Sequence, residues 1–217
     1  MTTLPVRATD KRTFTCRRCG ACCRNLKEQF MLGALDAYRL GNFLKKHMDD
    51  IQTIEDVFSK YAHIGTIMEG YPVYLMNTCG KDDACVFLEN GCCSVYESRP
   101  GVCRLYPLTV DISADGKRPL FYQCLDRHKA HFNGGEWNIG EWIKHNFPDE
   151  AQAYLLEESE VLLKIGHLIR QIGIQRTQEY LFPLLYFRYF NYDLDQPFMP
   201  QYRQNQQSLL NDLRMKL

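Results

Sequence analysis

The residues of this 217-residue chain that could do chemistry are cysteines in two dense groups. A Cys-x2-Cys turn lets two sulfurs reach one metal, as it does in zinc knuckles and iron–sulfur loops. A hydrophobic core repeats its apolar residues at helix or strand periods, so packing does not explain a Cys-x2-Cys-x2-Cys-Cys run. The spacing therefore indicates a metal-binding protein. The first group is Cys16, Cys19, Cys22 and Cys23, and the second is Cys85, Cys92, Cys93 and Cys103.

The expected metal follows mainly from the first group. Cys16, Cys19 and Cys22 match the first three positions of the bacterial ferredoxin run, but Cys23 follows at once instead of after three residues. Adjacent side chains diverge, so Cys22 and Cys23 serve different centres or only one of them ligates. Together with Cys85, Cys93, Cys103 and Cys124, the first group gives eight donors. Since a zinc ion or a cubane takes about four protein ligands, eight donors indicate two mononuclear sites or up to two clusters. We expect an iron–sulfur (4Fe-4S) cluster, with zinc as the alternative, because structural zinc seldom needs doubled cysteines.

Arginines lie inside and beside the cysteine motifs. Arg99 and Arg104 flank the Pro100-Gly101 turn of the second group. A guanidinium can hydrogen-bond a thiolate, lower a thiol pKa and offset the negative charge of a thiolate cage, and we expect both arginines to do so. A local basic run either does the same or faces solvent, and it consists of Lys11, Arg12, Arg17, Arg18 and Arg24.

Composition limits the partners. The 26 Lys and Arg residues balance 26 Asp and Glu residues, so nothing favours nucleic acid. Residues 1–15 lack the apolar segment of a secretory signal, and the apolar run 181–187 contains Pro183 and is too short for a membrane span. We expect a cytoplasmic protein that binds neither nucleic acid nor membrane. In that reducing compartment, ten cysteines favour thiolate ligands over disulfides.

The elements that must position the thiols are predicted to be short in the first part of the chain and long in the second. The stretch 79–103 is expected to be loop with short turns, where metal replaces regular structure. Beyond residue 136 the pattern is helical, with Leu162 in an apolar stripe and Glu158 on a solvated face. The other predicted elements are helices over 34–47, 53–62, 175–190 and 201–217, a strand over 71–76, and a hairpin of strands 105–112 and 118–124 around Asp115-Gly116.

These patterns predict an α+β fold in two parts. Residues 1–133 are expected to form a small, irregular, metal-stabilised cysteine-rich domain with short strands and flanking helices. Residues 134–217 are expected to form a helical C-terminal extension packed on that domain. The aromatic side chains of the C-terminal helices are expected to pack in the core, with a protein partner as the alternative.

Three ordered motifs cover about residues 14–125. They are Cys16-x2-Cys19-Gly20-x-Cys22-Cys23, Cys85-Val-Phe-Leu88 and Cys93-x-Val-Tyr96-x2-Arg99-Pro100-x2-Cys103-Arg104-x-Tyr106-Pro107. Together they resemble the CxxCxxCC, or YkgJ-like, family, which is described as a zinc- or iron-chelating domain and is related to flagellin lysine N-methylase. The resemblance implies as metal ligands Cys16, Cys19, Cys22, Cys23, Cys85, Cys93 and Cys103, with Cys124 as an eighth.

Signals outside these motifs are weaker. Cys79 and Cys92 are expected to be ordinary thiols, although Cys79 could replace a donor. The run Cys124-x3-His128-x2-His131 has the spacing of a mixed site, but solvated histidines are the expectation. No catalytic residue is predicted.

The functional prediction is an iron–sulfur protein with a redox or catalytic role. One alternative is a zinc-stabilised protein-interaction module. The other, a protein methyltransferase similar to the lysine N-methylase, follows from the resemblance alone, because no glycine fingerprint for S-adenosylmethionine follows a predicted strand.

Overall fold

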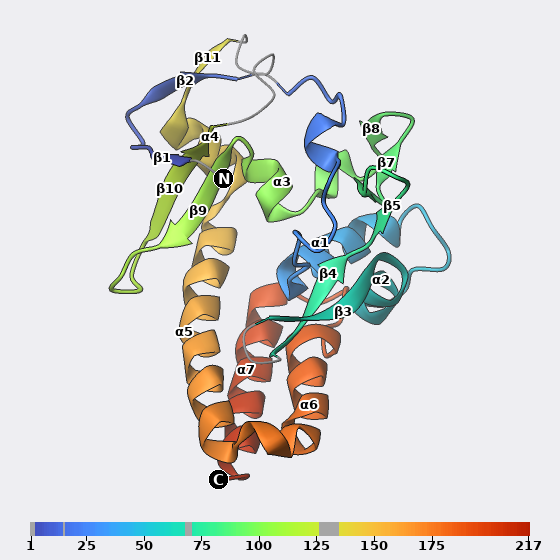
Figure 1. Cartoon of the computed structure of the whole chain (residues 1–217), viewed down its shortest axis with the longest axis vertical. Coiled ribbons are helices and arrows are strands. Elements are labelled where there is room, and N and C mark those ends of the chain that lie inside the picture. The colour runs from blue at the N-terminus through green and yellow to red at the C-terminus, as the bar shows by residue number, and fades with distance from the viewer. Residues whose placement is uncertain (1–2, 15, 68–70, 126–134) are drawn as a thin grey trace.

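The computed structural model describes residues 3–14, 16–67, 71–125 and 135–217. Its architecture is α+β, as predicted: short strands form small antiparallel sheets, and the C-terminal part is helical. In Figure 1 the cysteine-bearing segments lie in the upper part of the molecule, and helices of the C-terminal part run side by side in the lower part.

The largest sheet has three antiparallel strands in the order β1-β10-β9. They are β1 (Thr3–Pro5), β10 (Pro119–Cys124) and β9 (Leu108–Ile112). The β9–β10 hairpin confirms the prediction at Asp115-Gly116, since Gly116 has the positive φ of 72° that the turn requires. A second pair, β2 (Lys11–Thr13) and β11 (Glu136–Asn138), joins the N-terminal segment to the helical part.

Two helices and a hairpin follow the first cysteine group. The helices α1 (Ala34–Leu44) and α2 (Ile54–Tyr61) lie within the predicted ranges, and α2 begins at the capping box predicted from Thr53 and Asp56. The strand β4 (Tyr71–Met76) is also confirmed. Its partner β3 (Ala62–Ile67) was not predicted, because no periodic pattern distinguishes it from the end of α2.

The stretch predicted as loop contains very short elements. Two-residue ladders and single helical turns account for most of residues 78–105, and another helical turn carries Cys22 and Cys23. These elements are η1 (Ala21–Cys23), β5 (Thr78–Cys79), β6 (Ala84–Cys85), β7 (Leu88–Glu89), β8 (Cys92–Cys93), η2 (Tyr96–Ser98) and α3 (Gly101–Leu105).

The C-terminal part differs in detail from the prediction. The single helix predicted over 175–190 is divided into three segments, which change from 3-10 to α to π geometry around Pro183. The last helix begins three residues earlier than predicted. The helices are α4 (Ile139–Asn146), α5 (Asp149–Ile172), η4 (Ile174–Arg176), α6 (Thr177–Leu185), the π-helix η5 (Tyr186–Phe190) and α7 (Phe198–Arg214).

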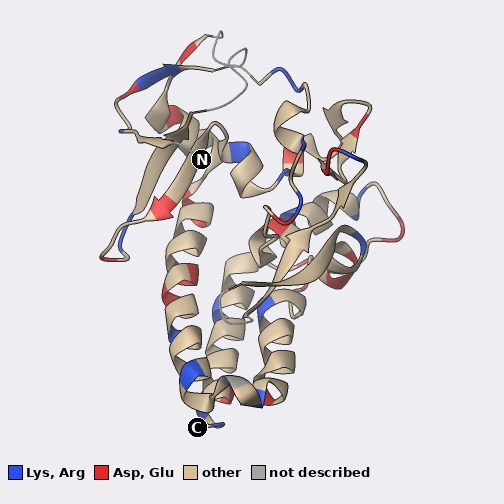
Figure 2. Cartoon of the chain, in the orientation of Figure 1, with Lys and Arg blue, Asp and Glu red and all other residues tan. Residues whose placement is uncertain are grey.

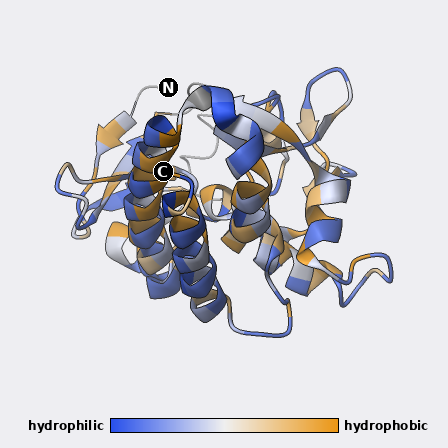
Figure 3. Cartoon of the chain, turned by 90° about the horizontal axis from the view of Figure 1, so that it is seen from below, coloured by the Kyte–Doolittle hydropathy of each residue, from blue (hydrophilic) through white to orange (hydrophobic). Residues whose placement is uncertain are grey.

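Two clusters of buried apolar side chains hold these elements together. The larger one contains Leu40, Phe58, Ile139 and Phe198, so residues on both sides of position 133 share it. The smaller one joins α5, α6 and α7. The division of the chain at residue 133 therefore stays a prediction. Viewed from below, the helices show hydrophilic stripes beside hydrophobic ones (Figure 3).

The predicted faces of α5 need correction at two positions. Leu162, predicted in the apolar stripe, is 38% exposed, whereas Ile165, Leu168 and Ile172 of the same helix are buried. Glu158, predicted on the solvated face, is only 16% exposed and forms an ion pair with the buried side chain of Arg188. The hydroxyl of Tyr202 donates to the same Glu158 carboxylate at 2.8 Å. The charged partner comes from η5, which periodicity within α5 could not indicate.

Charge and hydropathy limit the possible environments. Figure 2 shows both signs distributed along the molecule. In the described ranges, every helix is too short or too polar to cross a membrane.

Candidate metal centre

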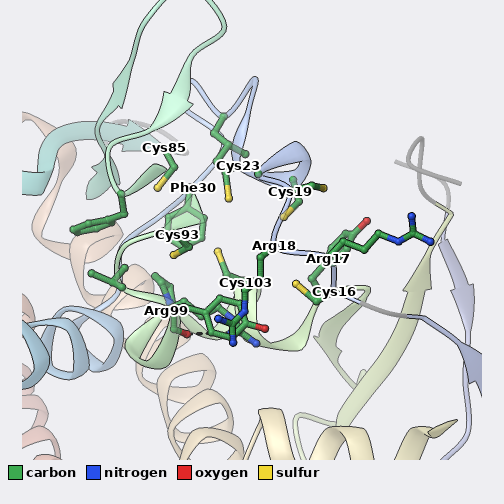
Figure 4. Close-up of a pocket in the computed structure, with 18 of the residues that line it drawn as sticks. Cys16, Arg17, Arg18, Cys19, Cys23, Phe30, Cys85, Cys93, Arg99 and Cys103 are labelled. Atoms are coloured by element: carbon green, nitrogen blue, oxygen red, sulfur yellow. Dashed lines mark hydrogen bonds between the residues drawn. The ribbon is translucent and has the colours of Figure 1, made fainter. Parts of the chain in front are cut away.

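Seven cysteines line one cavity of about 90 Å³. In Figure 4 the labelled sulfurs face a common space, with Cys85 and Cys93 on one side and Cys16 and Cys19 on the other. The other walls of the cavity are mainly apolar, and Phe30, Phe87 and Trp142 contribute to them. A water molecule needs about 10–15 Å³ of such space, so the cavity has room for a small inorganic centre. The seven cysteines are Cys16, Cys19, Cys22, Cys23, Cys85, Cys93 and Cys103.

Gly20 sets the turn that carries Cys22 and Cys23 into the cavity. Its φ is 69°, a left-handed conformation that favours glycine, and its carbonyl accepts the backbone N–H of Cys23 at 3.0 Å. A Cβ at this position would lie 2.7 Å from Leu88 Cδ1, so the turn also packs closely on the second cysteine group.

The segment after Cys23 is tied to the loop that precedes Cys85. The backbone N–H groups of Asn25 and Leu26 donate to the carbonyls of Asp82 and Asp83 at 2.7 and 3.0 Å. Arg24 adds an ion pair with Asp82. These contacts bring the first cysteine group beside β6, although about sixty residues separate them in sequence.

A tight hairpin positions Cys93. The strands β7 and β8 pair Leu88 with Cys93, and the two residues between the strands, Asn90 and Gly91, have φ of 50° and 78°. Two positive φ values in a two-residue loop are typical of a type I′ turn, for which Asn-Gly is the strongest sequence signal. This hairpin was not predicted from the sequence, although the Asn-Gly pair between the two strands is a sufficient signal for it.

Asp36 positions Cys103 from a distance. It lies in the first turn of α1, and its carboxylate accepts the backbone N–H of Gly101 at 2.9 Å, at the start of α3. Burial raises the pKa of Asp36, although Gly101, Arg39 and Arg104 each act to lower it. The half-buried Arg104 thus faces Asp36 and is absent from the cavity lining, contrary to the expectation that it accompanies a thiolate.

Two arginines of the cavity stack on one tyrosine. The Cζ atoms of Arg18 and Arg99 lie 4.0 and 3.8 Å from the ring centroid of Tyr96. Arg99 also acts on Cys93, where its charge lowers the thiol pKa, but the larger effect of burial leaves that pKa raised. The predicted role of Arg99 beside a thiol is therefore supported. The sequence pattern predicted no role for Tyr96. Its ring orients both guanidinium groups by stacking against them.

The thiols of the cavity influence one another. The hydrogen bond to Cys22, burial and the neighbouring thiols Cys103 and Cys85 raise the pKa of Cys23. Burial followed by Cys85 and Cys22 raises the pKa of Cys103. Cys22 raises the pKa of Cys23, Cys85, Cys93 and Cys103, so it lies near all four. Because a metal binds the thiolate form, metal loading must displace these protons.

The sulfurs surround the cavity without converging on a single point. Thiolates that bind one Zn²⁺ at about 2.3 Å lie roughly 4 Å from each other. Within the described ranges, no three His, Cys, Asp or Glu side chains are grouped closely enough to hold one metal ion. The seven thiols therefore border a shared cavity from several sides.

The remaining candidate residues lie elsewhere. Cys124 is buried in β10, where it pairs with Thr3, and is not among the lining residues of the cavity. Cys79 and Cys92 are exposed and also lie outside the lining. His128 and His131 lie outside the described residues.

Some residues of the predicted basic run line the cavity and others lie elsewhere. Arg17 and Arg18 line the cavity. Lys11 pairs with Glu136, and Arg12 with Asp10, so neither faces the thiols.

Comparison with known proteins gives one match. The family model CxxCxxCC, described as "Putative zinc- or iron-chelating domain", matches residues 15–130. No curated protein and no solved structure matches the chain. The matched range contains all seven cysteines of the cavity.

Proposed function

The chain belongs to the CxxCxxCC family of zinc- or iron-chelating domains, and from this premise we propose that it binds an iron–sulfur cluster in the cysteine cavity. The observation that carries the proposal is the convergence of seven thiols from separate segments on one cavity. Four of them would hold a 4Fe-4S cluster through its irons, and the cluster would supply a centre for electron transfer or for binding of a reactant. Cys124 lies apart and is not needed.

Three features support a cluster over zinc. The sulfurs are too far apart for one ion, the thiols outnumber the four that one tetrahedral zinc takes, and Arg18 and Arg99 lie where they can offset the charge of a thiolate cage. Burial of the apolar wall residues would shield such a centre from water. We also propose a cytoplasmic location, where reducing conditions keep the thiols available as ligands.

The test is anaerobic purification with iron, zinc and acid-labile sulfide measured per chain. We expect iron and sulfide in similar amounts and broad visible absorption. Cys22→Ser and Cys103→Ser should lower both contents, whereas the matched controls Cys79→Ser and Cys92→Ser should leave them unchanged. Zinc without sulfide would refute the cluster, and wild-type protein without any metal would refute the metal centre altogether.

One observation favours a second function, a zinc-stabilised module that binds a protein. The rings of Phe182 and Tyr186 stack with centroids 5.9 Å apart on α6 and η5, and Phe182 is 73% exposed. This function predicts a colourless zinc protein that unfolds with a chelator. The methyltransferase alternative stays a prediction, which calorimetry with S-adenosylmethionine would test.

A further inference from the structure

Arg18 and Arg99 hold their guanidinium groups against the same aromatic ring. Their Cζ atoms lie 4.0 and 3.8 Å from the centroid of Tyr96, and two guanidinium groups so close to one centroid must occupy opposite faces to avoid overlap. Arg18 belongs to the first cysteine group, whereas Tyr96 and Arg99 belong to the second. In Figure 4 the Arg18 side chain extends towards Arg99, while Arg17 extends away.

Stacking leaves the N–H donors of these arginines largely unused. A guanidinium has five donors in a planar fork, and stacking occupies its face rather than its edge. One N–H of Arg99 donates to the backbone carbonyl of Tyr96 at 3.0 Å. In the part of the chain that the structure describes, Arg18 makes no hydrogen bond or ion pair beyond its contact with the ring. Both forks are thus oriented by the protein and free to bind an acceptor.

Among the described residues, no carboxylate lines the cavity beside these donors. Its described lining includes three arginines, Arg17, Arg18 and Arg99, and no Asp, Glu or Lys. The nearby Asp36 accepts the Gly101 N–H instead. The apolar and aromatic walls lower the local polarity, which strengthens a charge-assisted hydrogen bond formed there.

We propose that Arg18 and Arg99, oriented by Tyr96, bind the carboxylate or phosphate group of a small molecule at the edge of the cysteine cavity. The two guanidinium forks would hold the oxyanion through charge-assisted hydrogen bonds at the edge of the cavity, which leaves the cavity itself to the metal centre. The site places the bound anion beside the metal centre. Its role as a substrate site rests on the proposed metal function, but anion binding itself does not.

Isothermal titration calorimetry of the full chain, at low ionic strength, tests the site with sulfate and with succinate as probes. Sulfate stands for a phosphate-type ligand and succinate for a carboxylate. We expect saturable heat with at least one probe. Losing a charged hydrogen-bond donor should weaken binding roughly 10- to 150-fold in Arg18→Gln and in Arg99→Gln. Tyr96→Leu should also weaken it, because the forks lose their support.

Arg118→Gln is the matched control. Arg118 is exposed at the β9–β10 hairpin, and its replacement changes the net charge equally, so binding should stay within about twofold of wild type. If circular dichroism shows that Arg18→Gln does not fold, Arg18→Lys is titrated instead. Lysine keeps the charge but lacks the planar fork of N–H donors, so Arg18→Lys should also bind the probe more weakly than wild type.

The outcomes separate the two proposals. No heat from either probe, or equal affinity in wild type and the Arg18 and Arg99 variants, overturns the anion site even if metal is present. Anion binding that depends on these arginines in a protein without metal would support the anion site and refute the metal centre instead.

Discussion

Replacing Gly20 by alanine would test whether the turn between Cys19 and Cys22 determines the geometry of the metal centre. Gly20 has φ of 69°, and a left-handed conformation costs an L-residue about 1–2 kcal/mol. The new Cβ would lie 2.7 Å from Leu88 Cδ1 and 3.1 Å from the Gly91 carbonyl oxygen. Overpacking of this kind costs about 1–3 kcal/mol. We therefore expect the free energy of unfolding to fall by roughly 2–5 kcal/mol.

The same substitution should loosen the metal. The Leu88 side chain can rotate away from the new methyl group, but the backbone carbonyl of Gly91 cannot. The turn that carries Cys22 and Cys23 should therefore shift by a few tenths of an ångström away from the second cysteine group. The assays are urea denaturation of the metal-free protein and release of metal to a chelator from the loaded protein. We expect faster release in Gly20→Ala than in wild type.

Gly116→Ala is the matched control. Gly116 has a similar φ of 72°, but a Cβ there would meet no atom within 4 Å, and the residue lies in the β9–β10 hairpin. The free energy of unfolding of Gly116→Ala should fall only by the cost of the left-handed conformation, about 1–2 kcal/mol, and this variant should keep its metal. If Gly20→Ala releases metal no faster than Gly116→Ala, the reasoning about the turn is refuted.

Three further predictions concern the supports of the site and of the core. Asp36→Ala should cost about 1–3 kcal/mol in unfolding experiments and speed metal release, because the Gly101 N–H loses its partner, whereas Asp36→Asn keeps an acceptor and should change little. Arg188→Leu should cost about 3–5 kcal/mol by leaving Glu158 buried without its partner, and Glu158→Leu in the same chain should recover most of that loss. The pKa of Cys103 is raised above its ordinary 9.0, so the folded state holds the thiol proton more tightly than the unfolded state does. In metal-free protein the contribution of Cys103 to the free energy of unfolding should be complete below about pH 9 and fall at higher pH, as urea midpoints would show.

Each of these predictions has a distinct contradicting result. Equal metal release from Asp36→Ala and Asp36→Asn would show that the acceptor does not position α3. A double variant of Arg188 and Glu158 as unstable as Arg188→Leu would mean that the lost stability comes from packing. A decline above pH 9 that is unchanged in Cys103→Ser would assign the titration to other groups.

Local patterns in the sequence determined much of the fold. The capping box at Thr53, the aromatic and branched composition of β4, and the Asp-Gly turn of the β9–β10 hairpin are all confirmed. Each depends on residues a few positions apart, whose hydrogen bonds and φ values form within the element itself. The Asn90-Gly91 hairpin was equally readable and was missed. The metal-binding character followed as well, because Cys-x2-Cys spacing brings two sulfurs together within one turn.

Only the tertiary structure decided which distant groups meet. The sequence of α5 predicts Glu158 on the solvated face, but the side chain is only 16% exposed because it pairs with Arg188 of η5. Cys124 looks like a further donor, yet the pairing of β10 with β1 holds it away from the cavity. Seven thiols share one cavity because backbone contacts between the N-terminal segment and the β5–β6 loop bring them together. Such contacts depend on the packing of segments far apart in sequence, and no periodicity within one segment specifies them.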